Sequence, residues 1–143
     1  GRFDDGRELF EAHRRVNPND VENAAWHFLC EAKANDIDSA RKLLLPAPGD
    51  RRVPMSEILD RLPGGDATKI EAAVNAIDHP MSKQSARFYA DLYLGLIADA
   101  ENKPDEALRF MTRAAETPMT HYMADVARVY ADHLRSSSKP KER

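Results

Sequence analysis

The sequence has few features of membrane-spanning or disulfide-stabilised proteins. No apolar run approaches the ~18 residues that a helix needs to cross a bilayer, and the mean hydropathy is −0.62. Cys30 is the only cysteine, so an internal disulfide cannot form. It stands among apolar residues at helical spacing, where we expect a buried and unreactive thiol. We therefore predict no transmembrane segment in this stretch of chain and no disulfide framework.

An excess of charge of one sign is also lacking. The 143 residues include 21 Lys and Arg against 24 Asp and Glu, which leaves a net charge of −3. Proteins that bind nucleic acids usually carry a basic face and a high isoelectric point, whereas the isoelectric point here is about 6.0. This balance argues against a nucleic-acid partner.

Motifs of common enzyme classes are missing as well. The sequence holds no phosphate-binding loop, no HExxH zinc motif and no nucleophile elbow. Acid–base catalysis would need carboxylates that converge in a dry pocket, and no spacing in the sequence predicts one. We therefore predict that the chain is not an enzyme and needs no metal or cofactor.

Helical periodicity is what the chain does contain. Apolar side chains recur three and four residues apart in nearly every segment, as at Tyr122, Val126 and Tyr130. Segments of ordinary helix length are separated by six breaks, which are NPND, PAPGDRRVP, LPGGD, DHPMS, ENKPD and ETPMT. No segment alternates at period two for long enough to form a strand. We predict an all-α protein with a single domain over residues 1–137 and a flexible tail over 138–143.

The helical segments also repeat along the chain. Gly6, Ala40 and Ala107 occupy equivalent places, 34 and then 67 residues apart. Each is followed four positions later by a bulky apolar residue, namely Phe10, Leu44 or Met111. A small residue lets the second helix of a pair lie close against the first, and the bulky one fills the groove beside it. The pattern therefore predicts closely packed helix pairs.

The repeat also predicts where helices end and begin. Asn35 and Asn102 are equivalent, and we expect both to end helices, because Asn tolerates the left-handed backbone that follows a last turn. Pro104 suits the first position of the next helix, with Asp105 and Glu106 near the positive end of that helix. The region around these residues is thus the best-formed repeat.

A period close to 34 residues with this small-and-bulky pattern resembles the tetratricopeptide repeat (TPR). The resemblance implies a TPR-like solenoid of antiparallel helix pairs in a right-handed superhelix, in which each pair needs its neighbours to bury its apolar faces. Five segments follow: the second helix of a truncated repeat at 2–18, a pair at 20–47, a degenerate pair at 54–78, the best pair at 82–117 and a closing, capping helix at 120–136. We expect the missing first helix to lie upstream. The chain departs from the pattern at Phe28, where the later unit has Gly95.

Three segments carry a closer resemblance, namely NPNDVENAAWHFLCEAKANDIDSARKLLLP, YADLYLGLIADAENKPDEALRFMTRAA and HYMADVARVYADHL. They resemble the C-terminal part of bacterial NlpI-type TPR proteins. Such proteins are exported or lipid-anchored adaptors. The resemblance implies a scaffold that binds proteins, a longer natural protein with an export signal, and a periplasmic or outer-membrane location. A cytoplasmic location is the alternative.

In a TPR fold the first helix of each pair lines a concave groove. The residues predicted to face a peptide or partner helix there are Ala25, Leu29, Tyr89, Leu92, Tyr93, Leu96 and Asp99. TPR cochaperones that clamp acidic peptide ends use Lys, Arg and Asn at such places, so an apolar or aromatic groove is favoured here. Packing of Tyr89 and Tyr93 in an ordinary core is the alternative.

Two other clusters have helical spacing. His121, Asp125 and Arg128 follow one helix face and form either part of the partner site or a candidate small-ligand or metal site. The alternative is a solvated face whose ion pairs contribute about 0–1 kcal/mol. His27 and Glu31 are also four residues apart, but two ligands do not complete a zinc site, and packing is the preferred interpretation.

Self-assembly is the remaining hypothesis. Residues 3–16 are predicted to form an amphipathic helix with a face that another element should cover. We therefore consider a homo-oligomer joined through residues 3–16 as an alternative role to that of an adaptor.

Overall fold

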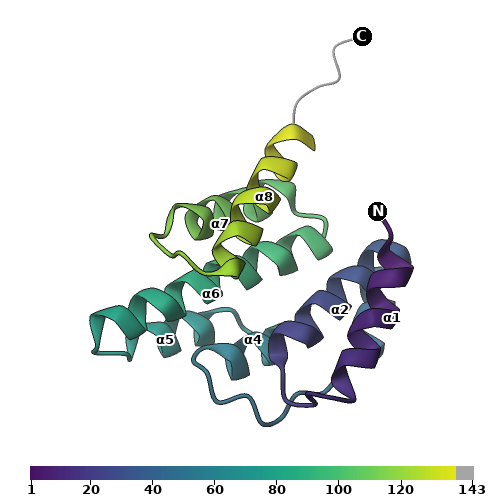
Figure 1. Cartoon of the computed structure of the whole chain (residues 1–143), viewed down its shortest axis with the longest axis horizontal. Helices are drawn as coiled ribbons and strands as arrows, with labels where there is room; N and C mark the ends of the chain where they lie inside the picture. The colour runs from purple at the N-terminus through teal and green to yellow at the C-terminus, as the bar shows by residue number, and fades with distance from the viewer. Residues whose placement is uncertain (138–143) are drawn as a thin grey trace. The chain divides into compact units, whose positions relative to one another are not determined.

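A computed structural model describes residues 1–137, and within them the chain forms eight α-helices and no strand (Figure 1). The prediction of an all-α protein is confirmed. None of these helices is long and apolar enough to cross a membrane. The tail predicted at 138–143 lies outside the described residues.

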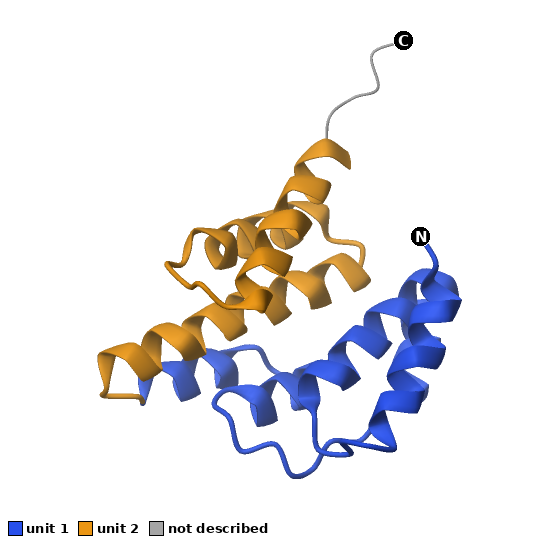
Figure 2. Ribbon diagram, in the orientation of Figure 1, with its two compact units in different colours: residues 1–76 blue, residues 77–143 orange. Residues whose placement is uncertain are grey.

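The chain divides into two compact units, the first over Gly1–Ala76 and the second from Ile77 onward (Figure 2). Each unit is compact by itself. The prediction of one domain over residues 1–137 stays a prediction.

The first unit is built around one central helix. It contains α1 (Phe3–Arg14), α2 (Val21–Ala34), α3 (Ile37–Lys42), α4 (Met55–Arg61) and α5 (Thr68–Asn75). Helix α2 packs against α1, α3 and α4, while α5 packs against α4. Fully buried side chains come from α2, α3, α4 and α5, and they include Val21, Phe28, Met55, Ile58 and Ile70.

Aspartate caps set the starts of α2 and α3. The Asp20 side chain accepts a hydrogen bond from the Glu22 N–H at 3.0 Å, and Asp36 accepts one from the Ser39 N–H at 2.7 Å. Each bond satisfies a backbone donor that the first turn leaves without an intrahelical partner. The bond from Ser39 also lowers the pKa of Asp36 below its usual value.

Helix α3 is shorter than predicted. We expected the second helix of this pair to continue to residue 47, but α3 ends at Lys42. Pro46 accounts for the early end, because it has no N–H to bond to the Lys42 carbonyl and it disfavours helical geometry at Leu45. Leu44, equivalent in the repeat to Phe10 and Met111, therefore lies outside any helix.

Helices α1 and α2 make a close contact at Gly6. A β-carbon on Gly6 would lie 2.9 Å from the Cys30 Sγ atom. The small residue therefore allows close packing, but with the helix that follows it in the chain. The predicted contact with the first helix of its own repeat stays a prediction.

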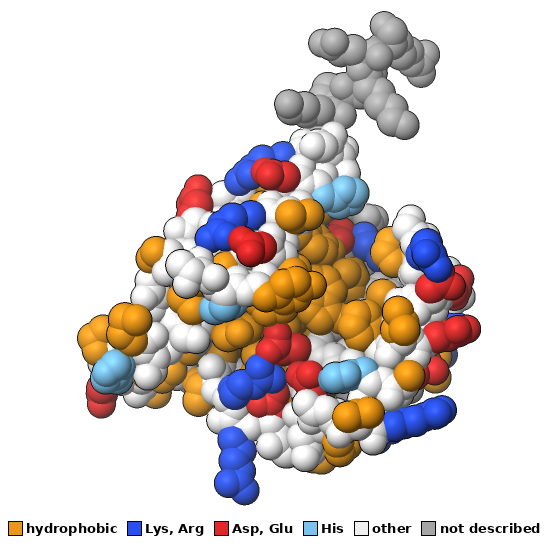
Figure 3. All heavy atoms as spheres, viewed as in Figure 1, with side chains coloured by type: hydrophobic (Ala, Val, Ile, Leu, Met, Phe, Trp, Pro, Cys, Tyr) orange, Lys and Arg blue, Asp and Glu red, His pale blue; other side chains and the backbone are white. Residues whose placement is uncertain are grey.

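The second unit has three helices in series. These are α6 (Pro80–Ala100), α7 (Pro104–Glu116) and α8 (Tyr122–Ser137), and α7 packs against both of the others. Pro80 and Pro104 occupy the first turns of their helices, as predicted for Pro104. The exposed side of α8 carries acidic and basic side chains next to one another (Figure 3), including the pairs Asp125–Arg128 at 2.6 Å and Asp132–Arg135 at 2.8 Å.

Two contacts hold α6 against α7. A β-carbon on Gly95 would lie 3.1 Å from the backbone nitrogen of Met111 and 3.3 Å from the carbonyl oxygen of Ala107. The predicted close approach of this pair is thus present. In addition, Arg113 Nη2 lies 3.0 Å from an oxygen of Asp91, whose side chain is only 2% exposed.

The end of α6 has the geometry predicted for Asn. Asn102 has φ of 58°. The Asn102 N–H donates to the backbone carbonyl of Asp99 at 3.1 Å, and the Lys103 N–H donates to the backbone carbonyl of Ala98 at 2.9 Å. These two hydrogen bonds form a Schellman motif. At the equivalent Asn35 the helix also ends, as predicted, but without the left-handed backbone, because its φ is −122°. There the side chain donates to Glu31 at 2.8 Å instead.

Candidate functional site

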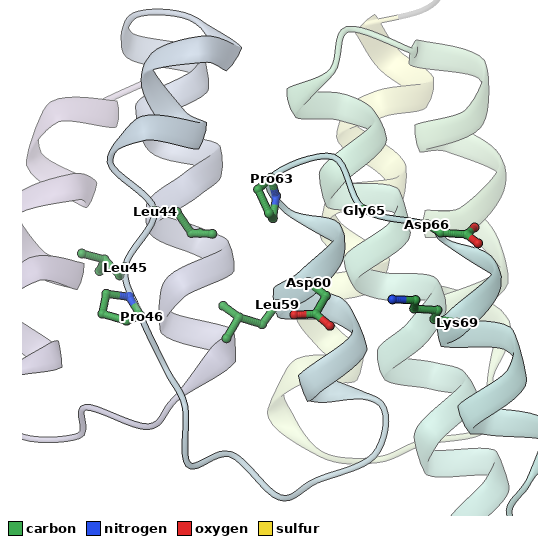
Figure 4. Close-up of a pocket in the computed structure, with 9 residues that line it drawn as sticks. All are labelled: Leu44, Leu45, Pro46, Leu59, Asp60, Pro63, Gly65, Asp66 and Lys69. Carbon is green, nitrogen blue, oxygen red and sulfur yellow. The ribbon is translucent and has the colours of Figure 1, made fainter.

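A pocket of about 490 Å³ opens in the first unit, between the segment after α3 and helices α4 and α5 (Figure 4). Its lining is apolar on one side, with Leu44, Leu45, Pro46, Leu59 and Pro63. Gly65 and three charged residues, Asp60, Asp66 and Lys69, complete it. Its volume lies within the ~300–1,000 Å³ that is usual for ligand pockets.

The lining side chains converge from three parts of the unit. Leu44 comes from the segment after α3 and Leu59 from α4, and both point into the space between these two elements (Figure 4). The Lys69 side chain extends from α5 toward Asp60 (Figure 4). An apolar side chain entering the pocket would thus meet leucine and proline, with charged groups at one side.

Hydrogen bonds hold Asp66, on the charged side of the pocket, in its ionised form. Asp66 accepts hydrogen bonds from the Thr68 hydroxyl at 2.6 Å and from the Thr68 N–H at 2.9 Å. These bonds lower the pKa of Asp66 below its usual value. Asp66 therefore carries a negative charge at neutral pH, which favours a basic group on a ligand.

Arg52 anchors the long segment that supplies the apolar side. Its guanidinium pairs with Asp50, Asp20 and Glu22, with Nη2 2.6 Å from Asp50 and 3.3 Å from Asp20. Burial opposes ionisation of Asp50, but hydrogen bonds from Arg52 and from the Val21 N–H outweigh it and lower the pKa of Asp50. The segment is therefore tied to the start of α2.

A second polar cluster joins α1 to α2. Arg7 Nη1 lies 3.0 Å from Glu31, which is 1% exposed, and Glu11 lies 3.1 Å from His27 Nε2. His27 and Glu31, considered above as a pair of ligands, thus have different partners. The preference for packing over a shared metal agrees with their burial.

Half of the ten residues predicted to bind a partner lie in the core. On α2, Ala25 has no exposed surface and Leu29 is 5% exposed. On α6, Leu92, Tyr93 and Leu96 have no exposed surface. A partner would have to displace their neighbours to touch them. That these residues contact a partner stays a prediction.

The remaining predicted residues of α6 are half-buried and already engaged. Tyr89 stacks on Tyr93 with ring centroids 6.4 Å apart, and it stacks on His121 at 5.8 Å. His121 also meets the edge of Phe88 at 5.1 Å. Asp99 accepts a hydrogen bond from the Tyr130 hydroxyl at 2.5 Å. The sequence did not predict that Phe88 would contact His121 or that Tyr130 would bond to Asp99.

His121, Asp125 and Arg128 do not converge as a metal site. Asp125 and Arg128 pair with each other on the exposed side of α8, and Arg128 also donates to the Met119 carbonyl at 2.8 Å. His121 instead joins the aromatic cluster of α6. Within residues 1–137, no group of three or more His, Cys, Asp or Glu side chains is arranged to hold a metal ion.

The pocket was not predicted, and it contains none of the residues predicted to bind a partner. One local feature pointed toward it. The run LLLPAP places three leucines directly before Pro46, which ends α3 early and leaves Leu44 and Leu45 free to form a wall. The opposite wall comes from α4 and α5, whose placement depends on tertiary packing.

Comparison of the chain with models of protein families found no match, and neither curated proteins nor solved structures matched it.

Proposed function

We propose that the chain is a protein–protein interaction module, built as a TPR-like array of helix pairs, that holds an apolar peptide segment of a partner protein. The close contact within the α6–α7 pair at Gly95, together with the close contact between α1 and the following helix α2 at Gly6, supports the TPR-like part of the proposal. The pocket of the first unit is the observation that carries the binding part, because it offers an apolar wall beside fixed charges.

The proposed occupant is an extended segment with bulky apolar side chains and one basic residue. Leu44, Leu45 and Leu59 would receive the apolar side chains. The basic residue would lie near Asp60 or Asp66, which outnumber Lys69 in the lining. Partners that carry clustered acidic groups would be repelled from this side of the pocket.

The same proposal treats the chain as a non-enzymatic adaptor of an exported bacterial protein. The resemblance to NlpI-type proteins motivates the periplasmic or outer-membrane location. Fractionation of cells that make the natural protein would test that location separately from binding.

Selection of random peptides displayed on phage against the whole chain tests binding. We expect enriched peptides to combine Leu, Ile or Phe with a neighbouring Lys or Arg. A peptide from this pool would then be synthesised. The Leu44→Asp variant should bind it tenfold or more weakly (about 1.4 kcal/mol), because the substitution places a charge in the apolar wall. Failure to enrich any peptide would count against the proposal.

Leu43→Asp is the matched control. Leu43 is adjacent in sequence and 54% exposed, but it does not line the pocket. It should change the affinity by less than about twofold, since exposed substitutions away from a site have small effects. Equal losses with Leu43→Asp and Leu44→Asp, with folding unchanged by circular dichroism, would place binding elsewhere.

A further inference from the structure

The helix α1 leaves one long face exposed. None of its side chains is buried. Leu9 is 70% exposed, and Val16, in the turn just after the helix, is 84% exposed. Asp5, Leu9, Ala12 and Val16 follow one another at steps of four, three and four residues, so they form one stripe, which we call the α1 stripe.

The α1 stripe faces away from α2. The side of α1 that meets α2 is marked by Gly6 against Cys30, by Arg7 against Glu31, and by the Phe10 carbonyl, which accepts from Asn23 at 2.9 Å. At 100° per residue, Leu9, Ala12 and Val16 are turned well away from that side. A further helix can therefore pack on the stripe without displacing α2.

Among the described residues, the charges of α1 that have no partner differ in sign between its two ends. In the first half, Arg2 pairs with Asp5 and Arg7 pairs with Glu31, which leaves Glu8 as an acidic group, whereas Arg15 lies at the end of the helix. Over α1, at the right-hand edge of Figure 3, acidic side chains lie between basic ones, with apolar side chains beside them. Within residues 1–137, neither Glu8 nor Arg15 forms an ion pair in the structure, and both are exposed. They lie seven residues apart, on the same edge of the α1 stripe.

We propose that α1 pairs antiparallel with α1 of a second copy of the chain, stripe against stripe. In this arrangement the acidic start of each helix meets the basic end of the other, and the helix dipoles oppose. Leu9 packs near Ala12 of the partner copy. Glu8 faces Arg15 of the partner copy, and the twofold symmetry repeats that pair on the other side of the axis.

Charge complementarity selects a second copy as the occupant. A covering helix must carry a basic residue opposite Glu8 and an acidic residue opposite Arg15. The reversed α1 sequence meets both requirements at the same register. The contact area of one short helix is small, so the dimer is weak and forms reversibly. This inference does not depend on peptide binding in the pocket.

Sedimentation equilibrium of the whole chain over a range up to millimolar concentration tests the pairing. We expect reversible dimerisation that weakens as salt is added. Glu8→Arg should raise the dimer dissociation constant about tenfold, because it replaces two attractions with two repulsions. Glu8→Arg combined with Arg15→Glu should restore it, since the charges are exchanged and still match.

The rescue separates antiparallel pairing from its alternatives. In a parallel pair residue 8 faces residue 13 of the other copy, so the exchange would not restore association. A monomer at all concentrations would overturn the proposal and leave the stripe to a different occupant. A dimer that is unaffected by Glu8→Arg would also overturn it. Circular dichroism of each variant establishes that loss of association is not loss of folding.

Discussion

Gly6 of α1 approaches Cys30 of α2 so closely that a β-carbon at residue 6 would lie 2.9 Å from the Cys30 sulfur. Because β-carbons essentially never come this close to another atom, an alanine at residue 6 would force one of the two atoms to move. The buried sulfur has little room to do so, because Cys30 is 9% exposed. The contact therefore limits residue 6 to glycine while residue 30 keeps its sulfur.

Gly6→Ala should lower the free energy of unfolding by about 1 kcal/mol, because the steric cost outweighs the gain in helix propensity of about 0.5–1 kcal/mol. In a Cys30→Ala background the same substitution should be neutral or stabilising, since the sulfur is gone. Urea unfolding of the two single variants and the double variant measures this coupling. Additive effects would show that the contact does not limit packing.

Asn102, after the end of α6, has a left-handed backbone, whereas Asn35 does not. Replacement by glycine should therefore change stability differently at the two positions. Asn102→Gly should leave stability unchanged or raise it by up to about 0.5 kcal/mol, because Gly adopts positive φ without strain. Asn35→Gly is the control and should destabilise, since Asn35 has φ of −122° and its side chain bonds to Glu31. Thermal melts of both variants test the difference. Equal losses at the two positions would contradict it.

The ion pair between Asp91 and Arg113 should stabilise the contact of α6 with α7. Arg113→Met keeps most of the side-chain bulk but removes the charge that faces the buried Asp91 carboxylate. We expect a loss of about 1–3 kcal/mol in the free energy of unfolding. Arg135→Met, which breaks the exposed pair with Asp132, should cost less than about 1 kcal/mol. Similar losses in the two variants would mean that burial of Asp91 adds nothing.

The Cys30 thiol should react slowly in the folded protein. Burial raises its pKa above the ordinary value of 9.0, so the reactive thiolate is scarcer at pH 8 than in the unfolded chain. Labelling with a disulfide reagent should be at least about tenfold slower in buffer than in denaturant. Fast labelling without denaturant would contradict the burial.

The same shift links the stability of the fold to pH. Because the pKa of Cys30 is raised on folding, this thiol favours the folded state below pH 9.0, and its contribution to stability is lost as pH rises through the folded-state pKa.

Local sequence features predicted the second unit well. Pro104 acts within the first turn of α7, and Gly95 meets Ala107 and Met111 on the helix that follows it, so both describe the α6–α7 pair with little influence from the rest of the chain. Asn102 belongs to the same class, because its left-handed conformation is decided by the adjacent turn. Asn35 shows the limit of such reasoning, since the nearby Glu31 carboxylate offers its side chain a different bond.

The candidate site depended on information that no local pattern contains. Repeat alignment placed Leu44 inside a helix, whereas Pro46 ends that helix and converts Leu44 into a pocket wall. Leu59 and Lys69 reach the same space only because α4 and α5 fold back. The predicted groove residues of α6 failed to mark an open surface for a related reason. Apolar side chains at helical spacing describe a buried face and an exposed groove equally well, and Leu92 and Leu96 proved to be buried.

Mapping of bound peptide by NMR tests the central claim most directly. A peptide enriched by selection would be titrated into ¹⁵N-labelled protein, and the shifts of backbone amides followed. The proposal predicts the largest shifts at Leu44, Leu45, Leu59 and Lys69, with little change at Tyr89 or His121. Large shifts at Tyr89 and His121, or no large shifts in either region, would show that the pocket of the first unit is not the binding site.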